Sequence, residues 1–390
     1  MRLLDICDFQ GGSQPPKEEW SFAEQEGYIR MLQIRDFTQS EKVTPEYIKI
    51  SNCIKTCTED DVLIARYGAS IGKVLTGIAG AYNVAIMRTI PDTDIIRKRF
   101  LYYYLKSSYF QYAILNVGSR AAQAGFNKTD LAKLEITCPE LSKQDKIVKI
   151  LEKVESIIQK RTDQLNALDY IIKARFVEMF GDENNPQNWD IINVEDVADV
   201  QVGVVIKPSQ YYTDKGNGVK AFRSLNIGEG FIKDNEWVYF TEEGHKKNSK
   251  SIVKENDLLI VRSGAPGTAC VVTQKYIGYN AIDIIIVHPD CKKVNPYYLC
   301  CYTNMPHGKK QINEGIGGAA QQHFNVGKYN KLRLMLPPKE LQDEFAAFVH
   351  QVDKSKLLSL IKLLEQLITY LYNVFIIYRQ DKGEEVEKYE

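Results

Sequence analysis

Histidines are the side chains of this sequence best suited to acid–base or nucleophilic chemistry, and all five lie in its second half. They are His245, His288, His307, His323 and His350. A catalytic histidine needs a nucleophile or an orienting carboxylate beside it. The sequence contains no nucleophile elbow and no HExxH pattern, so we expect these histidines to be surface or structural residues.

A glycine-rich segment, Gly68–Val74, resembles a phosphate-binding loop. Such a loop has four residues between its glycines, and a Ser or Thr after its lysine holds magnesium. Here only three residues separate the glycines, and Val74 follows Lys73. The matching segment that begins at Gly264 has lost the lysine. The pattern therefore predicts tight turns after two strands and no ATP site.

Other reaction classes also lack their motifs. The eight cysteines form no CxxC pair and no recurring framework, which argues against structural zinc and against a disulfide scaffold. The Pro-Pro pairs lack the acidic or Asn residue and the aromatic residue that adenine methylation would need, and the Pro-Asp pairs lack a following acidic-x-Lys pattern. We therefore expect a chain that is not an enzyme and binds neither metal nor cofactor itself.

The composition sets limits on partners and location. The 390 residues suit two or three domains, and their net charge is zero. Residues 1–140 carry 17 basic and 17 acidic side chains, and residues 181–338 carry 18 and 17. DNA binding would therefore need a local basic face or a basic partner. Because the sequence shows neither a signal peptide nor an apolar run of about 18 residues, we expect a cytoplasmic protein without membrane contact.

The chain repeats itself, which reveals the elements that position these residues. The matched segments are Asp61–Ala69 with Asp257–Ala265, residues 80–83 with 277–280, Phe126-Asn127 with Phe324-Asn325, residues 134–139 with 332–337, and Gln144 with Gln342. Their offsets drift only from 196 to 198. Such collinear matches predict a tandem duplication of about 195 residues.

Each copy mixes short β-rich runs with helical patches and ends at a proline that precedes a long helix, which predicts an α+β fold. The expected organisation is a first head (1–140), a long helix (141–181), a second head (182–338), a second long helix (339–380) and an acidic tail (381–390).

Both long helices carry apolar stripes at coiled-coil spacing. The stripe residues are Ile147, Leu151, Val154, Ile158, Leu165, Leu168 and Ile172 in the first helix, and Leu360, Leu364, Leu367 and Leu371 in the second. At roughly 40 residues, each helix would extend about 60 Å. We expect the two stripes to pack together as an antiparallel pair that separates the heads.

Two similar heads on a rigid spacer suit a target with repeated geometry, such as duplex DNA. The sequence resembles the specificity subunits of type I restriction-modification systems. The residues that carry this resemblance are the repeated Phe-Asn segments with their exits at Pro139 and Pro337, the Gln-containing helices after them, and the run from Phe176 to Asp182 that leads to Pro186–Trp189.

The resemblance implies that the heads are target-recognition domains that read the two halves of a bipartite site in double-stranded DNA. It also implies that two methylation subunits dock on the helices and that restriction/translocation subunits join them. S-adenosylmethionine, ATP and magnesium would then belong to those partner subunits, which would also supply much of the phosphate contact.

Base readout favours Arg or Lys for guanine and Asn or Gln for adenine. The candidate DNA-binding residues are Arg30, Arg35, Arg66, Lys73, Arg120, Gln123, Asn127, Arg223, Arg262, Gln321, Gln322, His323 and Asn325. Residues shared by the two heads, such as Arg66 with Arg262 and Asn127 with Asn325, would hold the fold or contact phosphates. Residues that differ between the heads would determine the sequence that is read.

A protein-binding scaffold is the alternative hypothesis. In it, the two heads bind protein partners around a coiled-coil spacer and do not recognise DNA, which accounts directly for the neutral charge. A screen of random duplexes for a bipartite site separates the two hypotheses.

Overall fold

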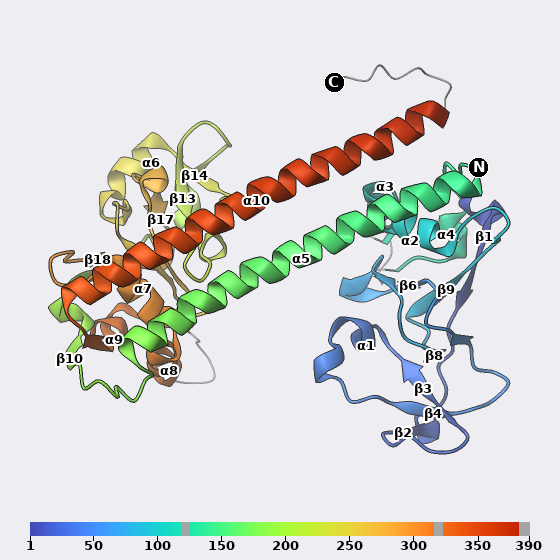
Figure 1. Cartoon of the computed structure of the whole chain (residues 1–390), viewed down its shortest axis with the longest axis horizontal. Coiled ribbons are helices and arrows are strands. Elements are labelled where there is room, and N and C mark those ends of the chain that lie inside the picture. Colours follow the sequence, from blue (N-terminus) through green and yellow to red (C-terminus); the bar gives the residue numbers. More distant parts are fainter. Residues whose placement is uncertain (119–124, 316–322, 382–390) are drawn as a thin grey trace. The chain divides into compact units, whose positions relative to one another are not determined.

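The computed structural model describes residues 1–118, 125–315 and 323–381. Its contacts divide the chain into two compact units. One is formed by Met1–Lys160 with the segment from Leu363 onward, and the other by Arg161–Lys362. Each unit therefore contains one head and part of each long helix (Figure 1).

Two sheets form the head of the first unit. Their strand orders are β1-β9-β6-β7 and β2-β4-β3-β8-β5. The strands are β1 (Cys7–Gly11), β2 (Trp20–Ser21), β3 (Tyr28–Leu32), β4 (Tyr47–Lys49), β5 (Thr56–Cys57), β6 (Leu63–Ala65), β7 (Val74–Leu75), β8 (Gly80–Tyr82) and β9 (Ile86–Pro91). The helices are α1 (Ile34–Thr38), α2 (Lys98–Lys106), α3 (Ser108–Gly118), α4 (Lys128–Leu131) and the long α5 (Leu141–Phe180).

The head of the second unit repeats this topology, with sheets ordered β11-β18-β15-β16 and β12-β14-β13-β17 and a further pair β10-β19. Its strands are β10 (Asp190–Asn193), β11 (Ala198–Val202), β12 (Tyr212–Thr213), β13 (Val219–Phe222), β14 (Val238–Phe240), β15 (Leu258–Val261), β16 (Ala269–Val271), β17 (Asn280–Ala281), β18 (Ile284–Pro289) and β19 (Arg333–Leu336). The helices are α6 (Glu242–Lys247), α7 (Pro296–Asn304), α8 (Pro306–Gly315), α9 (Val326–Asn330) and α10 (Lys339–Asp381).

The duplication extends to the details of strand pairing. β3 pairs in parallel with β8, and β13 pairs in parallel with β17, while the other named pairs of both heads are antiparallel. A parallel pair between two strands distant in sequence, at the same place in both copies, is a specific topological match. The structure confirms the predicted α+β fold with two similar heads and two long helices.

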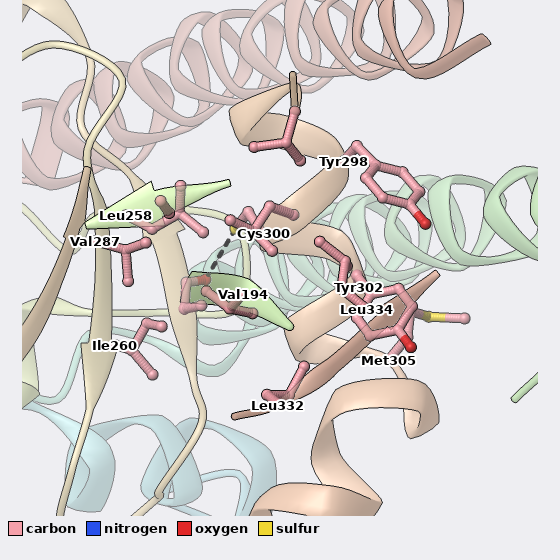
Figure 2. Close-up of a cluster of buried hydrophobic side chains, with 14 of the residues drawn as sticks. Val194, Leu258, Ile260, Val287, Tyr298, Cys300, Tyr302, Met305, Leu332 and Leu334 are labelled. Carbon is pink, nitrogen blue, oxygen red and sulfur yellow. Dashed lines mark hydrogen bonds between the residues drawn. The ribbon is translucent and has the colours of Figure 1, made fainter. Parts of the chain in front are cut away.

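The inner strands β6 and β15 carry the cores. Every residue of Leu63–Ala65 and of Leu258–Val261 is buried, which explains their continuous apolar sequence, since both faces of each strand are covered. Figure 2 shows side chains of β15 and β18 meeting those of α7 in one cluster of the second head, where the Cys300 thiol donates to the Ala269 carbonyl.

Within the second unit, the end of α5 packs antiparallel to the start of α10. Phe176 meets Phe345 edge to face at 5.4 Å between ring centroids. Asp169, two turns earlier on α5, pairs with Lys356, three turns later on α10, at 2.6 Å. Because residue numbers fall along one helix as they rise along the other, the two segments run in opposite directions, as predicted.

The packing face of α10 differs from the prediction. In α5, the predicted stripe is half-buried at Ile147, Leu151, Val154, Leu165, Leu168 and Ile172 and exposed at Ile158. In α10, Leu367 is half-buried. Leu360, Leu364 and Leu371 are 42%, 59% and 64% exposed. In the second unit, α10 instead buries Phe345, Val349 and Val352. This buried stripe continues at helical spacing through half-buried Lys356 and Ser359, so Leu360, Leu364 and Leu371 lie beside the contact face.

Candidate nucleic-acid interface

An arginine directly after each inner strand contacts the Phe-Asn segment of the same head. Arg66 Nε donates to the Phe126 carbonyl at 3.2 Å, and Arg262 Nε donates to the Phe324 carbonyl at 3.2 Å. The amides of Phe126 and Phe324 in turn donate to the carbonyls of Arg66 and Arg262, at 3.3 and 3.0 Å. Because this reciprocal contact recurs unchanged, its first effect is to hold the fold in both heads.

The two arginines differ in their remaining contacts. Arg262 Nη1 forms an ion pair with Asp283 Oδ1 at 2.5 Å, and its side chain is only 16% exposed. Arg66 lies over the ring of Tyr67, 4.9 Å from the ring centroid, and Tyr67 is itself exposed. Among the described residues, the guanidinium of the first head therefore has no carboxylate partner, whereas that of the second head has one.

Asn127 and Asn325 are helix N-caps. The Asn127 side-chain oxygen accepts from the amides of Thr129 and Asp130, at 2.9 and 3.2 Å, and starts α4. The Asn325 oxygen accepts from the Lys328 amide at 3.0 Å and starts α9. Each asparagine thus uses its acceptor to satisfy a free backbone donor of its helix.

The aspartate that precedes each inner strand also belongs to the shared frame. Asp61 accepts from the Thr58 amide at 3.0 Å, and Asp257 accepts from the Lys254 amide at 2.6 Å. Burial raises the pKa of Asp61, but the hydrogen bonds from the Thr58 amide and from Lys98 outweigh it and hold that pKa below its ordinary value. Asp61 is thus a structural anion in a turn.

His288 has the orienting carboxylate of a catalytic triad but, among the described residues, no nucleophile beside it. His288 Nδ1 lies 2.6 Å from Asp257 Oδ1, and its Nε2 lies 2.8 Å from the Gln201 side-chain nitrogen. A carboxamide at this position cannot act as the nucleophile of a triad. In the first head, the matching Asp61 is paired with Lys98 at 2.9 Å. The contact between His288 and Asp257 is therefore a structural hydrogen bond.

The three other arginine candidates among the described residues bind local acceptors. Arg30 pairs with Asp36 at 2.9 Å, and Arg35 pairs with Glu46 at 2.6 Å. Arg223 Nη2 donates to the Glu236 carbonyl at 2.6 Å.

Arg223 also holds a position in the fold that differs from those of Arg30 and Arg35. Its amide donates to Asn226 at 2.9 Å, just as the Gln33 amide donates to Asp36 at 2.8 Å. Arg223 is thus the counterpart of Gln33, at the start of the short helical turn that follows β13.

The glycine-rich segment after β6 is a turn, as predicted. Gly68 and Gly72 have φ values of +71° and +82°, which favour glycine. Gln111 of α3 donates to the Gly72 carbonyl at 2.8 Å, and a Cβ on Gly72 would lie 2.8 Å from the Gln111 side-chain oxygen. The turn thus packs against a helix, and Lys73 is exposed beside it.

The residues expected to distinguish the two heads are only partly described. Arg120, Gln123, Gln321 and Gln322 lie outside the described residues. His323 is exposed, and its Nδ1 is hydrogen-bonded to the Ser263 hydroxyl, which follows Arg262. The sequence indicated neither this contact nor the Arg-to-Phe contact, although the arginine and the phenylalanine both recur in the two copies.

The described residues contain neither a candidate membrane span nor a candidate metal-binding cluster. No helix among them is both long and apolar enough to cross a membrane. No group of three or more His, Cys, Asp or Glu side chains in the described part of the chain could hold a metal ion.

Comparison with known proteins places these features in context. The family described as the type I restriction modification DNA specificity domain matches residues 1–167 and 186–369. The MjaVIII type I restriction enzyme specificity subunit of Methanocaldococcus jannaschii is 21% identical over 375 residues, which cover 90% of this chain and 85% of that protein. The EcoBI specificity subunit of Escherichia coli is 21% identical over 167 residues, 43% of this chain and 35% of that protein.

Two solved structures share the fold. The S subunit of a type I restriction-modification system from M. genitalium has a TM-score of 0.53 at 14% identity, over 97% of this chain and 95% of that chain. A structure concerned with complex assembly and conformational transition of the type I R-M system has a TM-score of 0.53 at 15% identity, over 98% and 97%.

Proposed function

This chain belongs to the type I restriction-modification DNA specificity family, and we propose that each of its heads reads one half of a bipartite, asymmetric DNA site. Residues 1–140 and 182–338 are the two target-recognition domains in this proposal. The chain selects the sequence and performs no reaction itself. The comparisons offer no support for the alternative of a protein-binding scaffold.

One observation carries the proposal: a common frame bears different side chains at matching positions of the two heads. The Arg-to-Phe contacts and the N-cap asparagines are shared. Exposed Lys73 of the first head corresponds to buried Thr268 in the second. A shared frame with different surface groups suits two readers of unlike half-sites, since frame residues position the protein and base contacts specify the sequence.

Different roles follow for the candidate DNA-binding residues. Lys73 and Arg66 contact phosphates, because one is exposed and the other has no carboxylate partner among the described residues. The side-chain amides of Asn127 and Asn325 keep donors that can reach DNA. Arg120, Gln123, Gln321, Gln322 and His323 read base edges. Arg30, Arg35, Arg223 and Arg262 mainly support the frame, because each already holds an acceptor.

The long helices set the distance between the two half-sites and dock two methylation subunits. Support for docking comes from the exposed leucines Leu360, Leu364 and Leu371, since an apolar stripe at coiled-coil spacing is a packing surface. Restriction/translocation subunits join this complex in the cytoplasm. S-adenosylmethionine, ATP and magnesium are bound by the partner subunits.

The zero net charge of this chain agrees with a complex in which other subunits supply phosphate contacts. Phosphate contacts supply a large share of protein–DNA affinity and need many cations, whereas this chain carries 50 basic and 50 acidic residues. Basic surfaces of the methylation subunits therefore provide most of the phosphate contact, and this chain provides the sequence readout.

Selection from random duplexes tests the proposal. The chain together with its methylation subunits is expected to enrich a sequence with two short specific blocks at a fixed gap. Exchanging one head for that of a relative should change one block and leave the other block and the gap unchanged. If the assembled complex enriches no sequence, the proposal is wrong.

A further inference from the structure

Gln144 links the start of α5 to the head of the first unit through a fully buried amide. Its side-chain oxygen accepts from the Arg97 amide at 2.8 Å, and Arg97 is the N-cap of α2. Its side-chain nitrogen donates to the Ile95 carbonyl at 2.8 Å and to the Pro139 carbonyl at 2.7 Å. One side chain of the long helix thus fastens the helix, the turn before it and the start of α2 to one another.

Gln342 forms the same link in the second unit and is also fully buried. Its oxygen accepts from the Asn295 amide at 2.8 Å, and Asn295 is the N-cap of α7. Its nitrogen donates to the Pro337 carbonyl at 2.8 Å. The glutamine, the N-cap residue and the proline all recur at an offset of 198, so the whole arrangement is duplicated.

The residue after each glutamine reinforces the contact from the surface. Asp145 pairs with Arg97 at 3.2 Å, and both side chains are substantially exposed. Asp343 accepts from the Asn295 side chain at 2.8 Å. Exposed pairs of this kind contribute little energy, so the buried amide is the stronger part of the joint.

Only glutamine satisfies this joint. The buried carbonyls need a donor and the N-cap amide needs an acceptor, and a carboxamide supplies both. A glutamate carboxylate would face the carbonyls without a proton to donate, and methionine would leave all of these buried backbone groups unpaired.

A small change of angle at this joint would have a large effect at the other end of the helix. At 1.5 Å per residue, a helix of about 40 residues is about 60 Å long, so each degree of tilt moves its far end by about 1 Å. One base pair occupies about 3.4 Å along the duplex. A tilt of about 3° therefore corresponds to one base-pair step.

We propose that Gln144 and Gln342 are positioning residues that set the gap between the half-sites, by fixing the angle at which each long helix leaves its head. The inference rests on the proposed function, because it concerns how the two readers are spaced. The length of the long helices sets the approximate size of the gap, and the two buried side-chain amides set its exact value.

The test measures gap preference. The complex with its methylation subunits is bound to duplexes that contain both blocks at the preferred gap and at gaps one base pair shorter or longer. For Gln144→Met and Gln342→Met, the preference for the original gap is expected to fall about tenfold, because Gln144 loses its three hydrogen bonds to backbone groups and Gln342 loses its two. The sequence preference within each block should remain.

Two further variants control for an effect of any substitution at the start of α5 and for loss of folding. Lys146→Gln changes an exposed residue two positions after Gln144 on the same helix and should leave the gap preference unchanged. Gln144→Asn keeps a carboxamide that is one methylene too short, and it replaces Gln144→Met should that variant not fold, as judged by thermal unfolding.

Each outcome has a distinct meaning. A folded Gln→Met or Gln144→Asn variant with wild-type gap preference would overturn the inference. Loss of block preference together with gap preference would also overturn it, because the glutamines would then merely maintain the heads. If the wild-type complex selects no gapped sequence, the proposed function itself fails.

Discussion

Arg66 and Phe126 are joined by two hydrogen bonds, one from the Arg66 Nε to the Phe126 carbonyl (3.2 Å) and one from the Phe126 amide to the Arg66 carbonyl (3.3 Å). The residues are 60 positions apart, so the contact ties the end of the inner strand to the segment that precedes α4. Arg262 and Phe324 repeat it in the second head.

Substitutions of Arg66 and Arg262 should distinguish a role in stabilising the head from a role in binding DNA phosphates. Arg262→Met removes the hydrogen bond and leaves Asp283 unpaired, so the free energy of unfolding of the second unit should fall by about 1–3 kcal/mol. Arg66→Met should cost the first unit about 1 kcal/mol and reduce the slope of log binding constant against log salt by about 1. Denaturant unfolding and salt titrations of DNA binding measure both effects. An unchanged salt slope for Arg66→Met would contradict its phosphate contact.

Phe176 is expected to hold the second unit together. It is fully buried and contacts Phe180, Tyr298 and Phe345. Phe176→Ala should lower the unfolding free energy of the second unit by about 3–5 kcal/mol. Tyr170→Ala on the same helix, where the side chain is 72% exposed, should change it by less than about 0.5 kcal/mol. Calorimetry of the two variants checks this, and equal losses would argue against the observed packing face.

The exposed leucines of α10 should matter for assembly and not for folding. The double substitution of Leu360 and Leu364 by Ala should leave the melting temperature nearly unchanged, since both side chains are already exposed. It should weaken binding of the methylation subunits. Val352→Ala, at a buried position of the same helix, should have the reverse pattern. Thermal unfolding and a titration with the methylation subunit distinguish them, and unaltered affinity in the leucine variant would exclude this docking surface.

The first unit should lose stability in acid through Asp60 and Asp61. Hydrogen bonding from Lys98 lowers the pKa of Asp60 from 3.8 to about 2, and the pKa of Asp61 is also lowered. Carboxyls with a lowered folded pKa stabilise the fold above their unfolded pKa, and this contribution disappears as pH falls toward the folded value. Unfolding measured between pH 5 and about 2 should therefore show a steeper loss in the wild type than in Lys98→Met. Parallel curves would show that Lys98 is not the cause.

The sequence predicted the candidate site only in part, because side-chain partners depend on long-range contacts. The offset that relates Arg66 to Arg262 indicated a shared role, but the acceptors Phe126 and Phe324 were not identifiable from spacing. Likewise, nothing local to Arg30 or Arg35 indicates that Asp36 and Glu46 already occupy them.

By itself, the sequence determined the tandem duplication, the α+β composition of each head and the two long helices. These follow from repeated motifs and from periodicity, both of which are properties of order along the chain. Only the tertiary structure decided which stripe of α10 is buried. Successive residues lie about 100° apart around an α-helix, so two apolar stripes that are offset by one residue point in different directions. The partner surface selects which stripe is buried. Phe345 and Val349 pack into the core of the second unit, whereas Leu360 and Leu364 are 42% and 59% exposed. The buried amides of Gln144 and Gln342 likewise acquired their role from backbone groups that the fold brings to them.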